Sequence, residues 1–323
     1  MDKPLFDYQA DMADYVRNTE LMFRIMKEGV DRWCGGFKGK TVLEIGAGFQ
    51  LPHGGLTTCL ALRDGARRAF GIDICSPDNF ATQPDRVAFW RAARDLYGVE
   101  VRGLDEGRVH FASQNILFAD TLFSPVTMLQ MSASDMYFRD DMFDIMFSNA
   151  VFEHVPNVAK TMREMFRTMA PGGTAYIHWN PFTSLEMGGH DIGIPFYFPW
   201  AHLRLSEAEH VEMLRRVLAD PALYATANPP EHTITAARAQ ELAVDPGLFY
   251  RQMSADLNRL RVKDFLAYAR DAGFEILHSA YHIKDEMRLY LTDRVRAELP
   301  DYDDDELLTF FHSAALRKPG RVQ

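Results

Sequence analysis

Cysteine is scarce in this chain of 323 residues: Cys34, Cys59 and Cys75 are widely spaced. An odd number of cysteines with no CxxC pair indicates neither a disulfide framework nor a zinc knuckle. The absence of a CxxxCxxC pattern also excludes radical iron–sulfur chemistry. We therefore expect reduced thiols and a cytoplasmic protein.

Long apolar runs and an excess of positive charge are also missing. No stretch approaches the roughly 20 apolar residues of a membrane helix, and the opening MDKPLFDYQADMADY has no basic leader followed by an apolar run. The formal net charge is −10 at pH 7, and a surface of that sign repels phosphate backbones. We expect no membrane and no nucleic-acid partner, and a small molecule as the substrate.

The chain does contain a large apolar fraction, arranged as alternating strands and helices. Hydrophobic residues make up 47% of the sequence, which is enough for a substantial core. Apolar runs predict strands at 42–45, 69–74, 126–135, 143–155 (running into a turn and helix) and 174–180, with helices between most of them. With two closing strands after residue 262, this alternation predicts a doubly wound, mostly parallel, seven-stranded α/β fold.

The alternation breaks between 181 and 260, although no linker divides the chain into independent domains. We expect an N-terminal helical cap at 1–39, a cofactor-binding half at 40–180, and a closing helix with strands at 261–323. The segment 181–260 carries several histidines and aromatic residues. We interpret it as an inserted lid over the substrate.

The stretch TVLEIGAGFQLPHGG lacks the third glycine of a dinucleotide fingerprint. Gly46 and Gly48 are present, but Leu51 stands in the third position, and a proline follows it where a helix would have to open toward a pyrophosphate. Glu44 would face an anionic pyrophosphate unfavourably, whereas it suits a cationic ligand in a partly desolvated cleft. S-adenosylmethionine, with an ammonium, a sulfonium and no phosphate, is such a ligand.

Two further strand ends carry side chains that suit the rest of this ligand. Asp73 ends the strand AFGIDI, where a carboxylate can accept hydrogen bonds from both ribose hydroxyls. Ser134 and Asp135 follow the third strand, where a side chain can accept from the adenine amino group. Alternatively, Asp135 only caps the turn that it shares with two more aspartates.

Six motifs stand in the order that one known family uses: VLEIGAG, GIDI, MSASD, FDIMFSNAVFEHV, a helix ending in MAPGG, and the closing AGFEIL with FFHSAALRKP. Through them, over about 40–180 and 262–318, the chain resembles the class I S-adenosylmethionine-dependent methyltransferases. The resemblance implies a Rossmann-like methyltransferase fold and S-adenosylmethionine as cofactor. It implies cofactor contacts from Glu44, Gly46, Ala47, Gly48, Asp73, Ile74, Ser134, Asp135 and Asn149.

Two departures from the family pattern concern loops near the expected site. FQLPHGG replaces the third glycine that the family often has at Gln50, so this loop is either displaced or brings His53 into the site. The connection 75–126 is longer than a simple crossover requires. It could carry substrate or partner contacts.

The acceptor side offers two histidines. SNAVFEHV lies where ligands of open α/β sheets bind, and it lacks the Asn-Pro-Pro-Tyr of family members that methylate adenine or glutamine nitrogens. His154 in this motif is either the general base of methyl transfer to a hydroxyl or a structural residue at a helix start. His190, beside Asp191, is the second candidate, while the aromatic residues around it either exclude water or pack as ordinary core.

A metal site is not predicted from the sequence. His190 and His202 lack the i, i+4 spacing of ligands on one helix, and no carboxylate cluster accompanies them. Much of the catalysis would instead come from positioning, because a sulfonium is already an activated methyl donor.

These patterns predict an enzyme that transfers a methyl group to a small or medium-sized acceptor, through an oxygen of a sugar or another hydroxylated metabolite. N-methylation of a small amine remains open, because it would leave the same traces in the cofactor half. A non-catalytic S-adenosylmethionine-binding protein also remains open. Aminopropyl transfer is disfavoured, because no carboxylate pair for a diamine stands beside SNAVFEH. A homodimer is one option for the oligomeric state.

Overall fold

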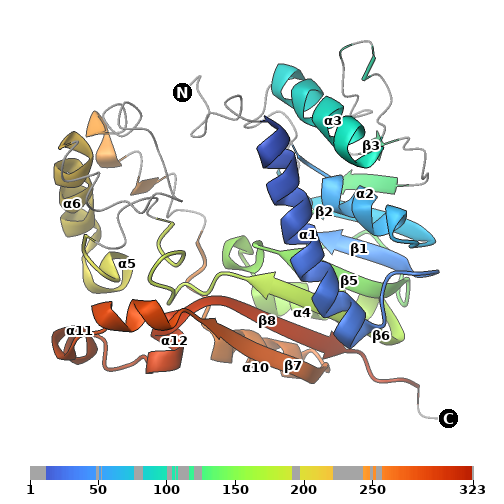
Figure 1. The fold of residues 1–323 in the computed structure, drawn as a ribbon. Helices are drawn as coiled ribbons and strands as arrows, with labels where there is room; N and C mark the ends of the chain where they lie inside the picture. Colours follow the sequence, from blue (N-terminus) through green and yellow to red (C-terminus); the bar gives the residue numbers. More distant parts are fainter. Residues whose placement is uncertain are drawn as a thin grey trace.

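The apolar runs of the sequence pair into one eight-stranded sheet in the computed structural model (Figure 1). The structure describes residues 12–48, 51, 53–75, 83–99, 104–105, 107, 116–119, 126–190, 197–220, 243–247, 250–251 and 257–321. Within these ranges the strand order is β3-β4-β2-β1-β5-β6-β8-β7. The strands are β1 (Thr41–Ile45), β2 (Arg68–Asp73), β3 (Ile116–Ala119), β4 (Val126–Gln130), β5 (Phe143–Asn149), β6 (Met169–Trp179), β7 (Glu275–Ile283) and β8 (Thr309–Arg317).

The sheet confirms the predicted doubly wound, mostly parallel architecture. β4, β2, β1, β5 and β6 are parallel to their neighbours, and β8 then pairs antiparallel with both β6 and β7. These seven strands are the predicted ones. The eighth, β3, pairs antiparallel with the edge strand β4 and was missed, because it lies in the connection 75–126 whose pattern predicted an irregular, partly helical segment.

Two predicted boundaries are wrong. β4 ends at Gln130 instead of residue 135, and a turn follows it. The helix α4 (Val158–Thr168) ends before Pro171, and the residues expected to stop it belong to β6. Met169 pairs with Phe143 there, and a register shift between Phe143 and Ile145 accommodates the extra residues. Strand pairing across the sheet has therefore overridden the local signal of the Pro-Gly-Gly sequence.

Helices cover both faces of the sheet, as the strand pattern requires. Val42 and Leu43 are both fully buried, because successive side chains of a strand point to opposite faces. Val42 packs in a core with the helices on one face, and Leu43 packs with those on the other. The first face carries α1 (Met12–Cys34), α2 (Leu56–Arg63) and α3 (Gln83–Tyr97), and the second carries α4 and α10 (Val262–Asp271).

The remaining helices lie toward one end of the molecule (Figure 1). They are α5 (Ala201–Arg204), α6 (Glu207–Ala219), η3 (Asp285–Tyr290), α11 (Asp293–Glu298) and α12 (Asp304–Leu308). Leu185 and Trp200 share a buried cluster with residues of the α11–α12 region, and Arg204 forms an ion pair with Glu298. The described beginning of the 181–260 segment is therefore anchored on the C-terminal part of the chain. No helix in the described part has both the length and the apolar character needed to cross a bilayer.

The carboxyl ends of the parallel strands meet at a single edge of the sheet. Because β1, β2, β4, β5 and β6 run in the same direction, the segments after them emerge together. Ligands of open α/β sheets bind at this edge. The predicted cofactor and acceptor residues follow these strand ends or close them, so the fold gathers them along this edge.

Candidate active site

The turn after β1 requires glycine at two positions. Gly46 and Gly48 have φ values of 77° and 68°, in the left-handed region that side chains other than glycine disfavour. The backbone amides of Gly46 and Ala47 both donate to the carbonyl oxygen of Ile72, at 2.8 and 2.9 Å. A Cβ atom on Gly46 would lie 2.2 Å from Cγ2 of Val151. The glycine turn therefore packs directly against the segment that follows β5.

Asp73 fixes the same turn from the end of β2. Its Oδ2 accepts a hydrogen bond from the Gly48 amide at 2.7 Å, and its Oδ1 accepts one from the Cys75 amide at 2.8 Å. Both oxygens are therefore engaged with the backbone of this edge, and the contact of Asp73 with the ribose hydroxyls stays a prediction. The next residue, Ile74, is 59% exposed and offers an apolar surface beside the carboxylate.

Glu44, expected to face a partly desolvated cleft, is nearly fully enclosed by the protein. It is 4% exposed, and its two carboxylate oxygens accept hydrogen bonds from the hydroxyls of Thr57 and Thr58 in the first turn of α2. Burial raises the pKa of Glu44 to about 7; the threonine hydrogen bonds oppose this effect, and the negative charge of Asp73 adds to it. Its described contacts therefore join β1 to α2, and its contact with a cofactor ammonium stays a prediction.

The loop that departs from the family pattern is held from two helices. A hydrogen bond joins Nδ1 of His53 to the Tyr15 hydroxyl of α1, and Arg86 of α3 donates to the Leu51 carbonyl at 3.2 Å. Burial, together with the positive charge of Arg86, lowers the pKa of His53 to about 4. His53 thus lies under the glycine turn, with Nε2 at 2.9 Å from the position of a Cβ on Gly48. Nothing in the local sequence indicated Tyr15 or Arg86.

The predicted adenine loop after β4 is a short turn with exposed acceptors. The Asp135 amide donates to the Ser132 carbonyl at 3.1 Å, which closes the turn. The Ser134 side chain is half-buried, with its hydroxyl 3.0 Å from that of Ser132, and the Asp135 side chain is exposed. The two predicted side chains therefore lie at the carboxyl edge, although their contact with adenine stays a prediction.

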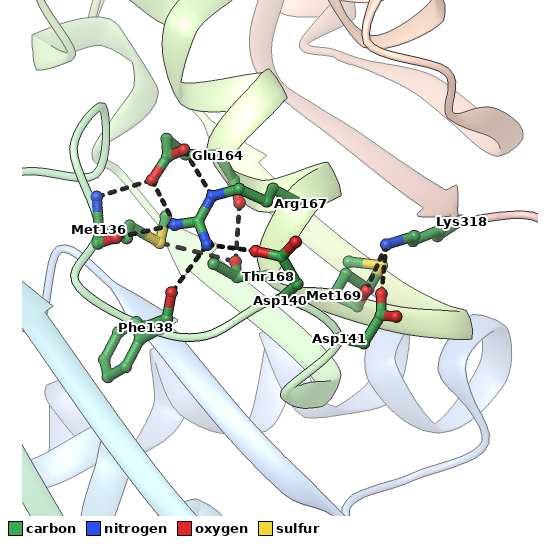
Figure 2. Close-up of polar contacts among 9 residues, drawn as sticks. All are labelled: Met136, Phe138, Asp140, Asp141, Glu164, Arg167, Thr168, Met169 and Lys318. Atoms are coloured by element: carbon green, nitrogen blue, oxygen red, sulfur yellow. Dashed lines mark hydrogen bonds and ion pairs between the residues drawn. The ribbon is translucent and has the colours of Figure 1, made fainter.

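A single arginine of α4 holds this loop in place (Figure 2). Arg167 forms a two-pronged ion pair with Glu164, at 2.9 and 2.8 Å. Its terminal nitrogens also donate to the carbonyl oxygens of Met136 and Phe138, each at 2.8 Å, and to Asp140 at 2.7 Å. These acceptors raise the pKa of Arg167, with Glu164 contributing most. The contacts span about thirty residues of sequence, so no local pattern could have indicated them.

Asn149 at the end of β5 is engaged by the neighbouring strand. Its Oδ1 lies 2.8 Å from Nδ1 of His178, its register partner on β6. Burial lowers the pKa of His178 to about 4, and the positive charge of a protonated His282 would lower it further. A neutral His178 therefore donates to the Asn149 oxygen, which leaves the Asn149 amide group as the donor available at the edge.

Both candidate bases lie together at this edge, although their positions in the sequence are distant. His154 closes the short 3₁₀ helix η1 (Phe152–His154) after β5, and His190 lies in the loop after β6. Their ring centroids are 5.0 Å apart. His154 is exposed and His190 is half-buried. Asp191, the expected partner of His190, lies outside the described residues.

Glu153 joins the two histidines, which the sequence did not predict. One ligand atom from each of Glu153, His154 and His190 lies within 4.8 Å of the others. Glu153 is 2% exposed, and Asn180 donates to its Oε1 at 3.0 Å. Burial raises the pKa of Glu153 to about 8, against the hydrogen bond from Asn180. His202, which the sequence analysis compared with His190, instead contacts the Phe182 carbonyl oxygen at 2.8 Å.

The aromatic residues of the 181–260 segment divide between the two expected roles. Phe182 and Trp200 are 9% and 0% exposed, and the Trp200 indole donates to the Thr183 carbonyl at 3.0 Å. They pack as core. Tyr197 is 37% exposed, while Phe196 lies outside the described residues.

Comparison with known proteins gives one family. A model of the methyltransferase domain matches residues 86–177, from α3 to β6. The chain is 34% identical over 194 residues to an uncharacterized methyltransferase of Mycobacterium avium, covering 59% of this chain and 68% of that protein. A second, from Mycolicibacterium vanbaalenii, is 28% identical over 196 residues, covering 60% and 68%.

Among solved structures, an S-adenosylmethionine-dependent methyltransferase from Mesorhizobium loti has a TM-score of 0.44 at 14% identity, covering 91% of this chain and 95% of that one. The stronger finding is the Mycobacterium avium relative, which shares about two thirds of its length with this chain. The sequence motifs after β1, β2, β4 and β5 lie at strand ends that the sheet order brings together. On these grounds the chain belongs to the class I S-adenosylmethionine-dependent methyltransferases.

Proposed function

We propose that this methyltransferase methylates a hydroxyl oxygen of a small or medium-sized acceptor, such as a sugar or another hydroxylated metabolite. The observation that carries this proposal is the pair His154 and His190, with rings 5.0 Å apart at the carboxyl edge of the sheet. His154 is close to the cofactor turn. Val151, the residue just before η1, packs against Gly46 of that turn. A hydroxyl acceptor must lose a proton during methylation, and an imidazole at this place can take it.

The cofactor is S-adenosylmethionine, and it supplies a methyl group on a positively charged sulfur that needs alignment and desolvation more than activation. The residues present fit it. Gly46 and Gly48 give the turn after β1 the positive φ values that bring bare backbone to the carboxyl edge, and the Asp73 carboxylate stands at the end of β2 beside that turn. Ile74 offers an exposed apolar side chain next to it, and the Ser134–Asp135 turn supplies acceptors for the adenine.

The remaining part of the proposal concerns the acceptor's surroundings. The segment 181–260 would act as the lid over the acceptor, with His190 as its contribution to the site. Its described start is anchored through Trp200 and Arg204 on the C-terminal helices. This anchoring supports a lid whose base is fixed, because a segment held at its start can position His190 beside His154.

The first experiment separates the cofactor half from the acceptor half. Isothermal titration with S-adenosylmethionine, S-adenosylhomocysteine and NAD is made on the wild type, on Asp73→Ala, and on Asp95→Ala as a control at an exposed aspartate. We expect both adenosyl ligands to bind the wild type and the control, to bind Asp73→Ala at least tenfold more weakly, and NAD not to bind.

A panel of hydroxylated metabolites and amines, with methyl-labelled cofactor, then tests the acceptor. We expect turnover on a hydroxyl, and we expect His154→Ala or His190→Ala to abolish it while S-adenosylhomocysteine still binds. Methylation of amines alone would contradict oxygen as the acceptor atom. Cofactor binding without turnover on any acceptor, unchanged by the histidine substitutions, would instead indicate a non-catalytic protein.

A further inference from the structure

Three side chains of metal-binding chemistry converge from two segments at the carboxyl edge. Glu153 and His154 belong to η1 after β5, and His190 belongs to the loop after the neighbouring strand β6. One ligand atom of each lies within 4.8 Å of the other two. Ligands of one ion at about 2.1 Å lie roughly 3.4 Å apart in a tetrahedral site. The observed spacing is therefore at most about 1.4 Å wider than that of a bound set, and the exposed His154 ring is the ligand with most freedom to move.

Two buried oxygens beside these histidines lack a hydrogen-bond donor in the described part of the chain. Glu153 Oε2 and Asn180 Oδ1 are buried and find no hydrogen-bond donor within the described ranges of the chain. Both residues are nearly inaccessible, at 2% and 3% exposed. Asn180 already donates to the other oxygen of Glu153. A buried acceptor without a donor is costly, and a bound cation at Glu153 Oε2 removes that cost.

The backbone that carries Glu153 and His154 is held by one asparagine. The Asn258 backbone amide donates to the Glu153 carbonyl at 2.9 Å. The Asn258 side chain donates to the carbonyls of Phe152 and Val155, at 2.6 and 2.8 Å. A metal site depends on such supporting hydrogen bonds, because they fix the ligands before the ion arrives.

His190 is held in an unusual backbone conformation. Its φ is 51°, in the left-handed region that costs about as much as a hydrogen bond for a residue with a Cβ. Its amide donates to the Met187 carbonyl at 3.3 Å. Backbone strain of this kind is concentrated at functional sites, and here it accompanies a ring that lies 5.0 Å from the ring of His154.

From this convergence we propose that Glu153, His154 and His190 bind one divalent transition-metal ion, with zinc as the best fit to the donor set. Two imidazole nitrogens and one carboxylate oxygen suit zinc and its neighbours better than calcium or magnesium, which prefer oxygen ligands. Three protein ligands leave an open coordination position, as in catalytic zinc sites. The sequence argument against a metal considered His190 and His202 as the pair, whereas the fold pairs His190 with Glu153 and His154.

The role of the ion rests on the proposed function, although its binding does not. With the ion bound, His154 and His190 would act as ligands, and the ion would take over the role that the imidazole base has in the metal-free protein. An acceptor hydroxyl in the open position would lose its proton to water, because coordination lowers the pKa of a bound oxygen. The ion would thereby make the acceptor oxygen a better nucleophile for the methyl group, and no oxidation or reduction is involved.

The test measures metal binding directly on the full chain after treatment with a chelator. Zinc chloride is titrated by calorimetry, and cobalt(II) chloride by visible absorption, into the wild type, His190→Ala and Glu153→Gln. His282→Ala is the matched control, because His282 is an exposed histidine of β7 outside the cluster. S-adenosylhomocysteine binding to each variant, measured without metal, shows that the variant is folded and tests the cofactor half separately.

We expect one ion per wild-type chain, at least tenfold weaker binding in His190→Ala and Glu153→Gln, and unchanged binding in His282→Ala. The absence of saturable binding by the wild type would overturn the proposal, and so would equal binding by the cluster variants and the control. A wild type that binds the metal but not S-adenosylhomocysteine would contradict the proposed function while leaving the metal site intact.

Discussion

Replacing Glu44 with glutamine should change how the stability of the protein depends on pH. Glu44 is buried between β1 and α2, and its pKa is raised from the ordinary value of 4.5 to about 7. Below pH 4.5 the carboxyl group is protonated in both the folded and the unfolded chain. Between pH 4.5 and 7 only the unfolded chain releases the proton, so the wild type loses stability as the pH rises through this window.

The size of this loss follows from the shift in pKa. Each unit corresponds to about 1.4 kcal/mol, so the shift of Glu44 corresponds to about 3 kcal/mol between pH 4.5 and pH 8. Glutamine carries no charge at any pH and can still accept a hydrogen bond from one of the two threonine hydroxyls. The unfolding free energy of Glu44→Gln relative to wild type should therefore rise by about 3 kcal/mol across this range.

Urea denaturation of both proteins at pH 4.5, 5.5, 6.5 and 8 measures this difference, and all other titrating groups cancel in the subtraction. Glu28→Gln, on an exposed position of α1, is the matched control, and its difference from wild type should stay flat. A flat difference for Glu44→Gln would refute the reasoning. It would mean that the hydroxyls of Thr57 and Thr58 stabilise the ionised carboxylate enough to cancel its burial.

Three further perturbations test other parts of the structure. Arg167→Met should weaken S-adenosylhomocysteine binding about tenfold, because it releases the loop after β4. Arg167→Lys should have an intermediate effect, because an ammonium cannot form the two-pronged ion pair. Equal calorimetric affinity of the wild type and both variants would contradict this. Gly46→Ala should lower the free energy of unfolding, measured by urea denaturation, by about 1–3 kcal/mol. Adding Val151→Ala should restore part of that free energy, because the new methyl group meets the Val151 side chain. His312 has a pKa lowered to about 3 by burial and by neighbouring histidines, so it should contribute about 3 kcal/mol to the stability that the wild type loses as the pH falls from 6.5 to 4, beside the losses from His53 and His178. His312→Gln should remove that part of the loss, and a parallel decline in both proteins would show that His312 is not its source.

Local patterns were sufficient for seven of the eight described strands and for the glycine turn. Val42 and Leu43 alternate between two buried faces, and this period of two is a property of any strand. Gly46 and Gly48 could be assigned because a positive φ is a requirement of the residue itself. Asp73 could also be placed, because the last residue of a parallel strand necessarily lies at the carboxyl edge of the sheet.

Predictions failed where a local signal competed with pairing across the sheet. The Pro-Gly-Gly sequence predicted the end of α4, but Met169 pairs with Phe143 and extends β6 toward the helix. Glu44 was expected to face a partly desolvated cleft because its charge suits a cation, and that contact stays a prediction. The threonines that enclose it lie on α2. The packing of α2 against β1 brings these hydroxyls to the carboxylate, and the local sequence does not predict that packing.

The sequence by itself determined the family, the doubly wound and mostly parallel sheet, and the strand ends at which we place the chemistry, because each depends on short patterns in a fixed order. Only the tertiary structure decided which side chains meet there. Arg167 reaches the loop after β4, and Glu153 and His154 lie beside His190. Such contacts join segments that are distant in the chain, and side-chain geometry at a strand end depends on the packing of neighbouring strands. No pattern along a single chain records that packing.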